Sequence, residues 1–260
     1  MKLFDSHCHL DDSVFAKDWS AVMDRMAAND VKAALIAGIN ADRSTKGLAL
    51  AQKNSGLYAA VGVHPHDASG CDEKTLTELK ALAANPKVRA WGEIGLDFNR
   101  MYSPRNVQEK WFVRQLEIAD ELGLPLIFHE RDSQGRLLEL LDQNPNSRRA
   151  GVVHCFSGTD TELARYLEMG FYIGITGILT IQKRGRRLRE QVSMIPSECI
   201  LIETDAPYLT PAPQKNRHRR NEPAFVKSVL LKLAAITGTE AESMADTVWQ
   251  NTCHLFGVGP

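Results

Sequence analysis

The sequence of 260 residues lacks the features that mark secreted, membrane-bound or strongly charged proteins. Its five cysteines form no C-x-x-C pair and follow no framework spacing, so we expect reduced thiols in a cytoplasmic protein. No apolar run approaches the roughly 20 residues of a membrane helix, and residues 1–4 lead directly into Asp5 without the apolar stretch of a secretory signal. The formal net charge of −1 indicates no class of partner. We therefore expect no membrane association, and the sequence gives no sign of an obligate protein partner.

What the sequence does contain is a series of short apolar runs separated by helical segments. A hydrophobic fraction of 43% is enough for a sizeable core. The runs are apolar on both faces, as in a buried parallel sheet, and they span residues 2–5, 31–37, 58–63, 88–93, 125–129, 151–154, 171–175 and 200–204. Eight β-then-α units favour an α/β fold, a closed (β/α)8 TIM-type barrel that forms a single domain over residues 1–260. The sequence alone also allows an open doubly wound sheet.

Helix signals separate these runs. Ser103 and Pro104 are typical of a helix start, and Gly123 is typical of its end. A second helix is expected to begin with a capping box formed by Thr159 and Glu162. These signals support the alternation of strands and helices on which the barrel prediction depends.

Side chains that can bind a divalent metal ion follow the apolar runs at equivalent points. In an extended segment residues two apart point the same way, so a His-x-His can direct both imidazoles to one ion. Because the carboxyl ends of barrel strands meet on one rim, we expect the whole set to converge there. The set consists of His7, His9, Glu93, His129, His154 and Asp205.

Each member of the set also has an ordinary explanation when it is taken alone. A histidine can simply be hydrogen-bonded, Asp205 can cap the turn before Pro207, and Glu93 can form half of a buried ion pair. Independent explanations would have to fall at the same structural position, which favours a metal site. Mixed imidazole and carboxylate ligands suit Zn²⁺, Mn²⁺ or Mg²⁺ equally. The two oxygens of Glu93 could bridge two ions.

Beyond single residues, the chain resembles the TatD family of metal-dependent deoxyribonucleases, within the amidohydrolase-like barrels. The resemblance rests on DSHCHL at residues 5–10, GVHPH at 62–66, GEIGLD at 92–97, HCFSG at 154–158, ETDAPYL at 203–209 and RNEP at 220–223. These blocks cover nearly the whole chain in the family's order.

The resemblance implies a TIM-type barrel with one or two metal ions that hydrolyses phosphodiester bonds, often 3′→5′ on single-stranded DNA. Carried over residue by residue, it implies the same six ligands, and the retained His-x-His favours two ions. His7, His9, Glu93 and Asp205 would hold one ion, and Glu93, His129 and His154 the other. One departure is Glu130, where the family often has a small residue.

For catalysis we expect Glu93 and Asp205 to be the principal residues, with Asp205 orienting the attacking water or accepting its proton. Glu203 shares a strand face with Asp205 and is expected to support the site. The expected substrate contacts, which would bind phosphate or stack on a base, are His64, His66, Arg131 and Tyr208, with Phe98 as a further stacking candidate. His64 and His66 could instead support the metal ligands from behind or form a rigid turn with Pro65, and Tyr208 could equally pack under the last loop.

Basic residues follow the seventh and eighth runs, so both groups could stand at the metal rim and contact DNA phosphates. They are Lys183, Arg184, Arg186, Arg187 and Arg189, and then Lys215, Arg217, Arg219 and Arg220. Charge runs are also typical of solvated helix faces and loops.

Two other functions stay open at this point. A barrel amidohydrolase acting on a cyclic amide, lactone or deaminase substrate shares His-x-His and a late aspartate, although many such enzymes bridge their metals with a carboxylated lysine where this chain has Glu93. A non-catalytic nucleic-acid-binding or interaction protein could hold a structural metal ion, but structural zinc sites are usually closed by four ligands. Six candidate ligands leave room for water.

Overall fold

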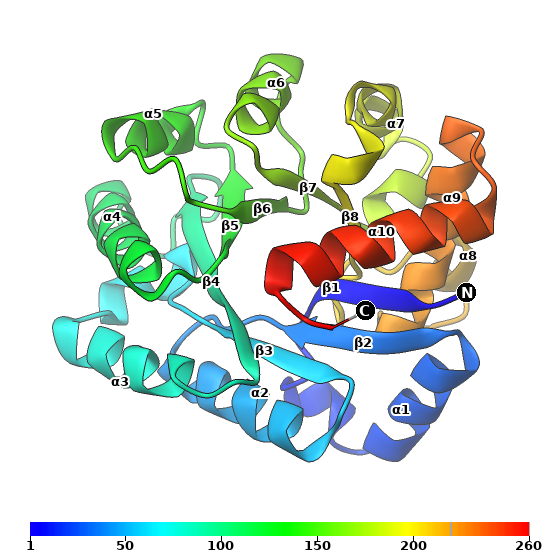
Figure 1. Ribbon diagram of the computed structural model, residues 1–260, viewed down its shortest axis with the longest axis horizontal. Helices are drawn as coiled ribbons and strands as arrows, with labels where there is room; N and C mark the ends of the chain where they lie inside the picture. Colours follow the sequence, from blue (N-terminus) through cyan, green and yellow to red (C-terminus); the bar gives the residue numbers. More distant parts are fainter. Residues whose placement is uncertain (219, 260) are drawn as a thin grey trace.

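The computed structural model describes residues 1–218 and 220–259. Eight parallel strands form one sheet in the order β1 to β8, as Figure 1 shows. The strands are β1 (Leu3–Cys8), β2 (Val31–Ile36), β3 (Leu57–Val61), β4 (Val88–Asp97), β5 (Leu126–Arg131), β6 (Gly151–His154), β7 (Tyr172–Ile175) and β8 (Ile200–Ile202).

Helices connect the strands and surround them on the outside (Figure 1). The α-helices are α1 (Trp19–Ala28), α2 (Ala41–Lys53), α3 (Glu73–Ala83), α4 (Arg105–Leu122), α5 (Arg136–Gln143), α6 (Asp160–Glu168), α7 (Arg186–Gln191), α8 (Ala212–Lys215), α9 (Val226–Thr237) and α10 (Ala241–Phe256). Short 3-10 helices occupy several loops, namely η1 (Ser13–Phe15), η2 (Pro65–Gly70), η3 (Gly177–Thr180), η4 (Val192–Met194), η5 (Ser197–Cys199) and η6 (Pro223–Phe225).

The sheet closes where the segment after β8 meets the end of β1. Cys8 forms a parallel bridge with Ala206. The amide of Asp205 donates to the carbonyl oxygen of His7 at 2.9 Å, and the amide of His9 donates to the carbonyl oxygen of Ala206 at 2.7 Å. These bonds turn the eight-stranded sheet into the nearly closed barrel that the sequence predicts, and the barrel prediction is confirmed.

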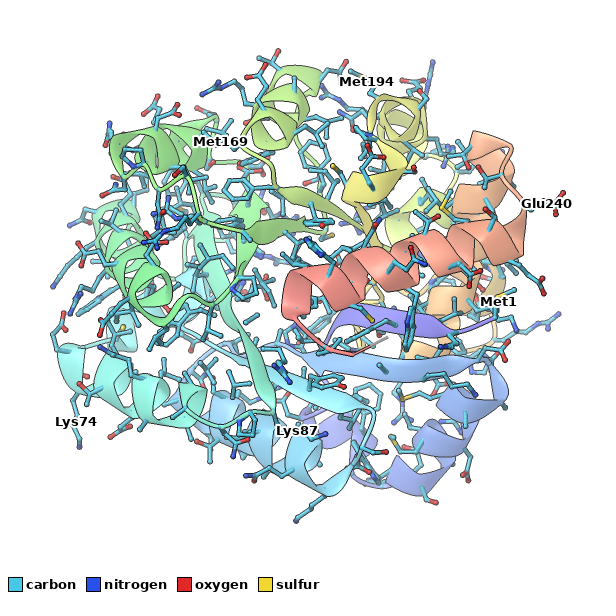
Figure 2. The ribbon with its side chains drawn as sticks, viewed as in Figure 1. Met1, Lys74, Lys87, Met169, Met194 and Glu240 are labelled. Carbon is cyan, nitrogen blue, oxygen red and sulfur yellow. The ribbon has the colours of Figure 1, made fainter. Side chains whose placement is uncertain are left out.

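Alternate residues of each strand face two different hydrophobic cores. In β5, Ile127 points into the barrel, where it belongs to a cluster with Phe4 of β1, whereas Phe128 packs in the larger cluster between strands and helices. Phe256 at the end of α10 joins the inner cluster. In Figure 1, α10 lies across one end of the barrel. Figure 2 shows side chains filling the space between the barrel and its helices, while charged residues such as Lys74 lie at the periphery. The other end of the barrel is left open for a site.

The helix signals of the sequence are mostly confirmed. Thr159 and Glu162 form the expected capping box of α6. Gly123 ends α4 in the left-handed conformation, with a φ of 64°. Pro104, however, is the residue that caps α4, and the hydroxyl of Ser103 donates instead to the carbonyl oxygen of His66 at 3.1 Å. Ser103 therefore ties two loops together and does not cap the helix.

Several predicted strand boundaries at the site need correction. β1 continues past residue 5 to Cys8 and so contains His7, β5 continues past His129 to Arg131, and β8 ends at Ile202 and not at residue 204. The largest difference is in β4. We expected a strand to end at Glu93, but β4 continues to Asp97 and pairs with β5 as far as Asp97 and Arg131. The glycines around Glu93 suggested a strand end. Gly95 instead allows close pairing, because a Cβ atom there would meet the carbonyl oxygen of His129 at 1.9 Å. Glu93 thus projects from within a strand.

Within the described residues, no helix combines the length and apolar character needed to cross a bilayer.

Candidate metal centre

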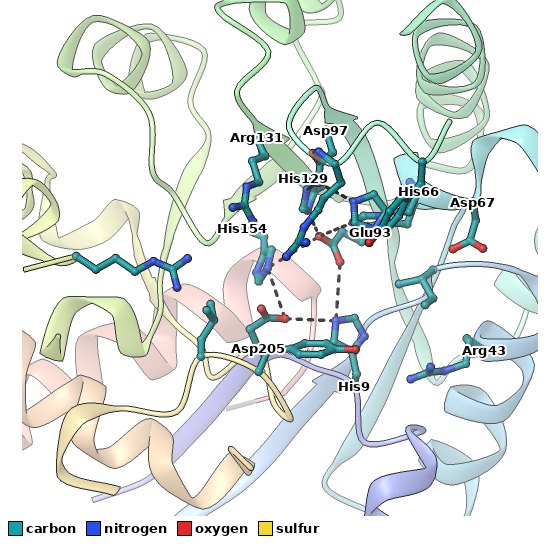
Figure 3. A pocket seen from close by; sticks show the side chains of 17 residues that line it. His9, Arg43, His66, Asp67, Glu93, Asp97, His129, Arg131, His154 and Asp205 are labelled. Atoms are coloured by element: carbon teal, nitrogen blue, oxygen red, sulfur yellow. Dashed lines mark hydrogen bonds and ion pairs between the residues drawn. The ribbon is translucent and has the colours of Figure 1, made fainter. Parts of the chain in front are cut away.

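A cavity of about 620 Å³ opens at the carboxyl ends of the strands (Figure 3). Five of the six predicted ligands line it, and they are His9, Glu93, His129, His154 and Asp205. His7 lies behind them with no exposed surface. All four predicted substrate contacts also line the cavity, namely His64, His66, Arg131 and Tyr208. The structure therefore brings together the six predicted ligands and these four predicted substrate contacts, while the role of each one stays a prediction.

Glu93 lies in the middle of this group, and its two carboxylate oxygens face different histidines. Oε2 is 3.3 Å from Nε2 of His7 and 4.0 Å from Nε2 of His9. Oε1 is 2.6 Å from Nδ1 of His129 and 3.9 Å from Nε2 of His154. The carboxylate therefore separates two sets of imidazole nitrogens, which is the arrangement required of a bridging ligand.

Asp205 closes the side of the site that faces β1. Its Oδ1 atom lies 3.3 Å from Nε2 of His9, 3.7 Å from Nε2 of His7 and 3.8 Å from Nε2 of His154. The two imidazole nitrogens of the His-x-His are themselves 3.4 Å apart. Because His7 and His9 point to the same side of β1, as the strand period requires, both reach Asp205 across the barrel seam.

The residue before Asp205 is held by a buried carboxylate of β1. Asp5 accepts hydrogen bonds from the amide of Thr204 at 2.8 Å and from its hydroxyl at 2.5 Å. Burial raises the pKa of Asp5 to about 8, against the lowering effect of the bonds from Thr204. Asp5 thus links the first strand to the end of the last one and fixes the segment that carries Asp205.

His154 is supported from behind by Glu203. Oε1 of Glu203 lies 2.8 Å from Nδ1 of His154 and accepts a hydrogen bond from the amide of Cys155 at 2.6 Å. Glu203 is fully buried. The contact leaves Nε2 of His154 as the nitrogen that faces the cavity. Glu203 and Asp205 both lie beyond the end of β8, so this contact and not strand alternation connects Glu203 with the site.

A second carboxylate, Asp97, holds the opposite side of the site. Its Oδ2 atom is 2.6 Å from Nε2 of His66 and 3.4 Å from Nε2 of His129. Its Oδ1 atom accepts hydrogen bonds from the amides of Asn99 at 3.0 Å and Arg100 at 2.7 Å. Asp97 therefore fixes the ring of His129 so that Nδ1 faces Glu93.

The carboxylates and imidazoles of the centre shift one another's pKa values. Burial raises the pKa of Glu93, but His64, His7 and His154 lower it by more, to well below its ordinary value. Burial lowers the pKa of His154, whereas Glu203 and Glu93 raise it to about 10. Burial also lowers the pKa of His129, whereas hydrogen bonds with Asp97 and Glu93 raise it to about 9. The carboxylates around His129 and His154 thus favour positive charge at both imidazoles.

The donor atoms fit one or more divalent ions. Among the described residues, three groups of side chains have ligand atoms within 4.8 Å of one another, and they are His7 with His9 and Glu93, His7 with His154 and Asp205, and His64 with His66 and His129. Nitrogen and oxygen donors of this kind suit zinc, manganese or magnesium. Two of the groups share His7. All three members of the third group line the same cavity as His9, His154 and Asp205, so the groups belong to one centre.

Several cavity residues were not predicted as site residues. Asp97 appeared only within the GEIGLD block, and Arg43, Arg100 and Tyr102 were not considered. Tyr102 lines the cavity, whereas Phe98, which we expected to stack on a base, does not and carries the guanidinium of Arg105 over its ring. The sequence could have indicated Tyr102 as a site residue only by its position, because it is an aromatic residue in the loop that follows β4.

Glu130, the departure from the family pattern, faces its own loop. Its Oε1 atom accepts hydrogen bonds from the amide of Ser133 at 2.9 Å and from the hydroxyl of Ser133 at 2.6 Å. It is not among the cavity-lining residues of the part of the chain that the structure describes. Glu130 therefore lies in β5, and its side chain fixes the loop that follows this strand.

The two basic groups are only partly available for phosphate. Arg184 is exposed and lines the cavity, and it also lines a second hollow of about 440 Å³ that includes Arg186 and Arg187. Arg189 instead donates to the carbonyl oxygens of Leu179, Ile181 and Gln182. This contradicts the expectation that the whole group faces the rim, because Arg189 holds the loop after β7.

In the second basic group, Arg220 has a structural role. It donates to Asp18 and to the carbonyl oxygen of Val14, both at 2.5 Å, and its guanidinium lies over the ring of Phe15. Arg219 lies outside the described residues. Arg220 therefore fixes the segment after β8 to the loop after β1. Its guanidinium group is engaged in these contacts and not directed at a phosphate.

Comparison with known proteins agrees with this geometry. Residues 4–257 match the family described as TatD related DNase. The chain is 42% identical to the "3'-5' ssDNA/RNA exonuclease TatD" of Escherichia fergusonii, over 98% of this chain and 99% of that protein. It is 41% identical to the protein of the same name from Escherichia coli K12, with the same coverage.

Solved structures give the same result. The crystal structure of YjjV, a TatD homologue from Escherichia coli K12, has a TM-score of 0.89 at 30% identity and covers 99% of this chain and 98% of that chain. A TatD family hydrolase from Entamoeba histolytica also has a TM-score of 0.89, at 26% identity, with 98% of both chains covered. With a matching barrel, a matching sequence over nearly its whole length and a centre built from the expected blocks, the chain belongs to the family of TatD-related DNases.

Proposed function

We propose that this chain is a metal-dependent nuclease that hydrolyses phosphodiester bonds of single-stranded DNA or RNA from the 3′ end. The observation that carries the proposal is the central position of Glu93, whose two oxygens face separate sets of histidine nitrogens inside an open cavity. Relatives that cover nearly the whole chain are named as exonucleases of this kind. We assign the activity to residues 1–260 as one domain and, from the five unpaired thiols, to the cytoplasm.

We assign two ions to the centre, with magnesium, manganese or zinc as the candidates. His7, His9 and Asp205 would hold the first ion, and His129 and His154 the second, with Glu93 between them. The assignment is supported by Oε2 of Glu93 facing His7 at 3.3 Å and Oε1 facing His129 at 2.6 Å. When bound, such ions activate water and offset charge on the phosphate.

The protein itself would orient the reactants. Asp205 lies at the cavity wall, where its carboxylate can accept the proton of an attacking water. Arg131 and Arg184 stand at the rim, where their guanidinium groups can bind the phosphate oxygens of the substrate. His64 lies 3.6 Å from Oε1 of Glu93, and burial lowers its pKa to about 4, so it stays neutral and suits a supporting hydrogen bond.

The proposal is tested by incubating the purified protein, loaded with each candidate metal, with end-labelled single- and double-stranded oligonucleotides. We expect mononucleotides to be released from single strands, and we expect Glu93→Gln and Asp205→Asn to lose this activity while the circular dichroism spectrum is unchanged. A panel of cyclic amides and lactones provides the comparison. Activity on that panel together with inactivity on every oligonucleotide would contradict the proposal.

A further inference from the structure

Two tyrosines stand out among the exposed side chains of the molecule. Tyr102 is 65% exposed and Tyr208 is 54% exposed. Both line the cavity of the metal centre. Among the described residues, every other phenylalanine, tryptophan and tyrosine side chain is buried or only partly exposed. Exposed aromatic rings at a binding cavity usually mark a surface that contacts a ligand.

The barrel topology places the two rings on opposite sides of the cavity mouth. Tyr102 belongs to the loop after β4, and Tyr208 to the loop after β8. Since the strands run in order from β1 to β8 around the barrel, β4 and β8 are four positions apart among eight. Loops that follow such strands face each other across the rim.

Each ring also stands next to a histidine of the centre. The ring centroid of Tyr102 is 4.7 Å from that of His66, in an edge-to-face arrangement. The ring centroid of Tyr208 is 5.9 Å from that of His9, also edge to face. The two tyrosines are therefore within reach of the nucleotides that flank a phosphate bound at the centre.

The loops that carry the rings are tied down even though the rings are exposed. Beside Tyr102, the carbonyl oxygen of Ser103 accepts a hydrogen bond from Gln108 at 2.7 Å. The carbonyl oxygen of Tyr208 accepts one from the side-chain amide of Asn221 at 2.6 Å. These bonds restrict the backbones that carry the rings, which lowers the entropy lost when a base stacks on them.

We propose that Tyr102 and Tyr208 form an aromatic bracket in which each ring stacks on one of the two nucleobases that flank the scissile phosphate. The inference rests on the proposed nuclease function and adds how the site selects its substrate. A base in a duplex is already stacked and paired, so only an unpaired nucleotide can turn its face toward a tyrosine. Stacking on a ring tolerates every base, so the bracket selects single strands without selecting sequence.

The test combines tyrosine variants with substrates that lack a base. Tyr102→Ala and Tyr208→Ala are assayed on a single-stranded oligonucleotide and on two versions in which a tetrahydrofuran residue replaces the base on one or the other side of the terminal phosphodiester bond. Each alanine variant should lower kcat/KM on the intact strand by roughly 5- to 150-fold, the range for loss of one stacked base. On the version that lacks the base stacked by that tyrosine, the same variant should lower kcat/KM by less than about twofold. The stacking interaction that the substitution removes is already absent from this substrate.

Controls separate stacking from general damage. Tyr102→Phe and Tyr208→Phe keep the ring and should retain activity. Met101→Ala changes an exposed neighbour that is 41% exposed and does not line the cavity, and it should have no effect. Binding is followed separately with 2-aminopurine at the flanking positions and the Glu93→Gln protein, which does not cleave. The fluorescence of 2-aminopurine should be quenched when the strand binds the Glu93→Gln protein, and adding either tyrosine-to-alanine substitution to that protein should restore it.

The outcomes distinguish the two proposals. If the alanine variants lose the same factor on intact and base-free strands, or leave 2-aminopurine quenched, the bracket is wrong even though the nuclease proposal stands. If the parent protein hydrolyses no oligonucleotide with any metal, the proposed function itself is wrong.

Discussion

Glu203 lies directly behind His154, with its Oε1 atom 2.8 Å from Nδ1 of the imidazole. The same oxygen accepts a hydrogen bond from the amide of Cys155, so the carboxylate is fixed by the backbone of the segment it supports. On the far side, a Cβ atom added at Gly174 would lie 2.7 Å from this carboxylate. The orientation of His154 therefore depends on a residue that never reaches the cavity.

We predict that Glu203→Gln weakens metal binding by about 10- to 100-fold, because partners behind a ligating histidine typically have effects of this size. The barrel should persist, since glutamine has nearly the same shape. Isothermal titration with manganese or zinc measures the affinity. Glu198→Gln, at an exposed position before β8, is the matched control and should bind normally. Equal affinities for the two variants would show that Glu203 does not orient His154.

Metal affinity should rise with pH across the neutral range. The pKa of His154 is raised to about 10 and that of His129 to about 9, so both are protonated at neutral pH before a metal ion arrives. A metal ion must displace these protons in order to bind. For each proton that it displaces, the apparent affinity for the ion should rise by about tenfold with every unit of pH. Titrations at pH 6, 7 and 8 measure the slope, and an affinity that does not change between pH 6 and 8 would contradict it.

The two arginines Arg184 and Arg189 should respond differently to substitution. Arg184→Gln removes an exposed charge at the cavity, so oligonucleotide binding should weaken and its logarithmic salt dependence should fall by about 0.7 for each lost phosphate contact. Arg189→Gln should leave that slope unchanged but lower the melting temperature, because three carbonyl oxygens lose their donor. Binding curves at several salt concentrations and thermal melts distinguish the two effects. The same salt slope for Arg184→Gln as for the parent would show that Arg184 is merely solvated.

Gly95→Ala should destabilise the protein by at least about 1–3 kcal/mol, the range for a residue forced into an unfavourable backbone conformation. The φ of Gly95 is +147°, and a Cβ atom there would run into the backbone of β5 at His129. Urea denaturation gives the free energy of unfolding. Gly70→Ala, where nothing lies within 4 Å of the added atom, is the control and should be nearly neutral. Equal stability of both variants would contradict the close pairing of β4 and β5.

The sequence predicts the barrel well because periodicity and apolar runs are local signals. All eight strands occur close to their expected positions, and the six candidate ligands converge because the topology of a barrel determines which strand ends meet. The extension of β4 was missed because Gly95 permits pairing that its neighbours in the sequence do not reveal.

Contacts between distant segments were beyond the reach of the sequence. Arg189 and Arg220 look like free charges in a basic run, yet their partners are carbonyl oxygens and an aspartate that only the fold brings near. Tyr102 looks like an ordinary loop residue until β4 is placed opposite β8. Local pattern thus predicts which elements form, whereas the role of a long polar or aromatic side chain depends on the segment across from it.

The seam between the first and last strands gives the centre a particular order of assembly. His7 and His9 are made at the start of synthesis, but their neighbour Asp205 joins them only when the segment after β8 reaches β1. Until the segment after β8 has been synthesised, His7 and His9 lack Asp205 as a neighbour on the barrel rim. Nuclease activity would therefore be withheld from incomplete chains, and a cation bound by His7, His9 and Asp205 would join the first strand of the finished barrel to the segment after the last one.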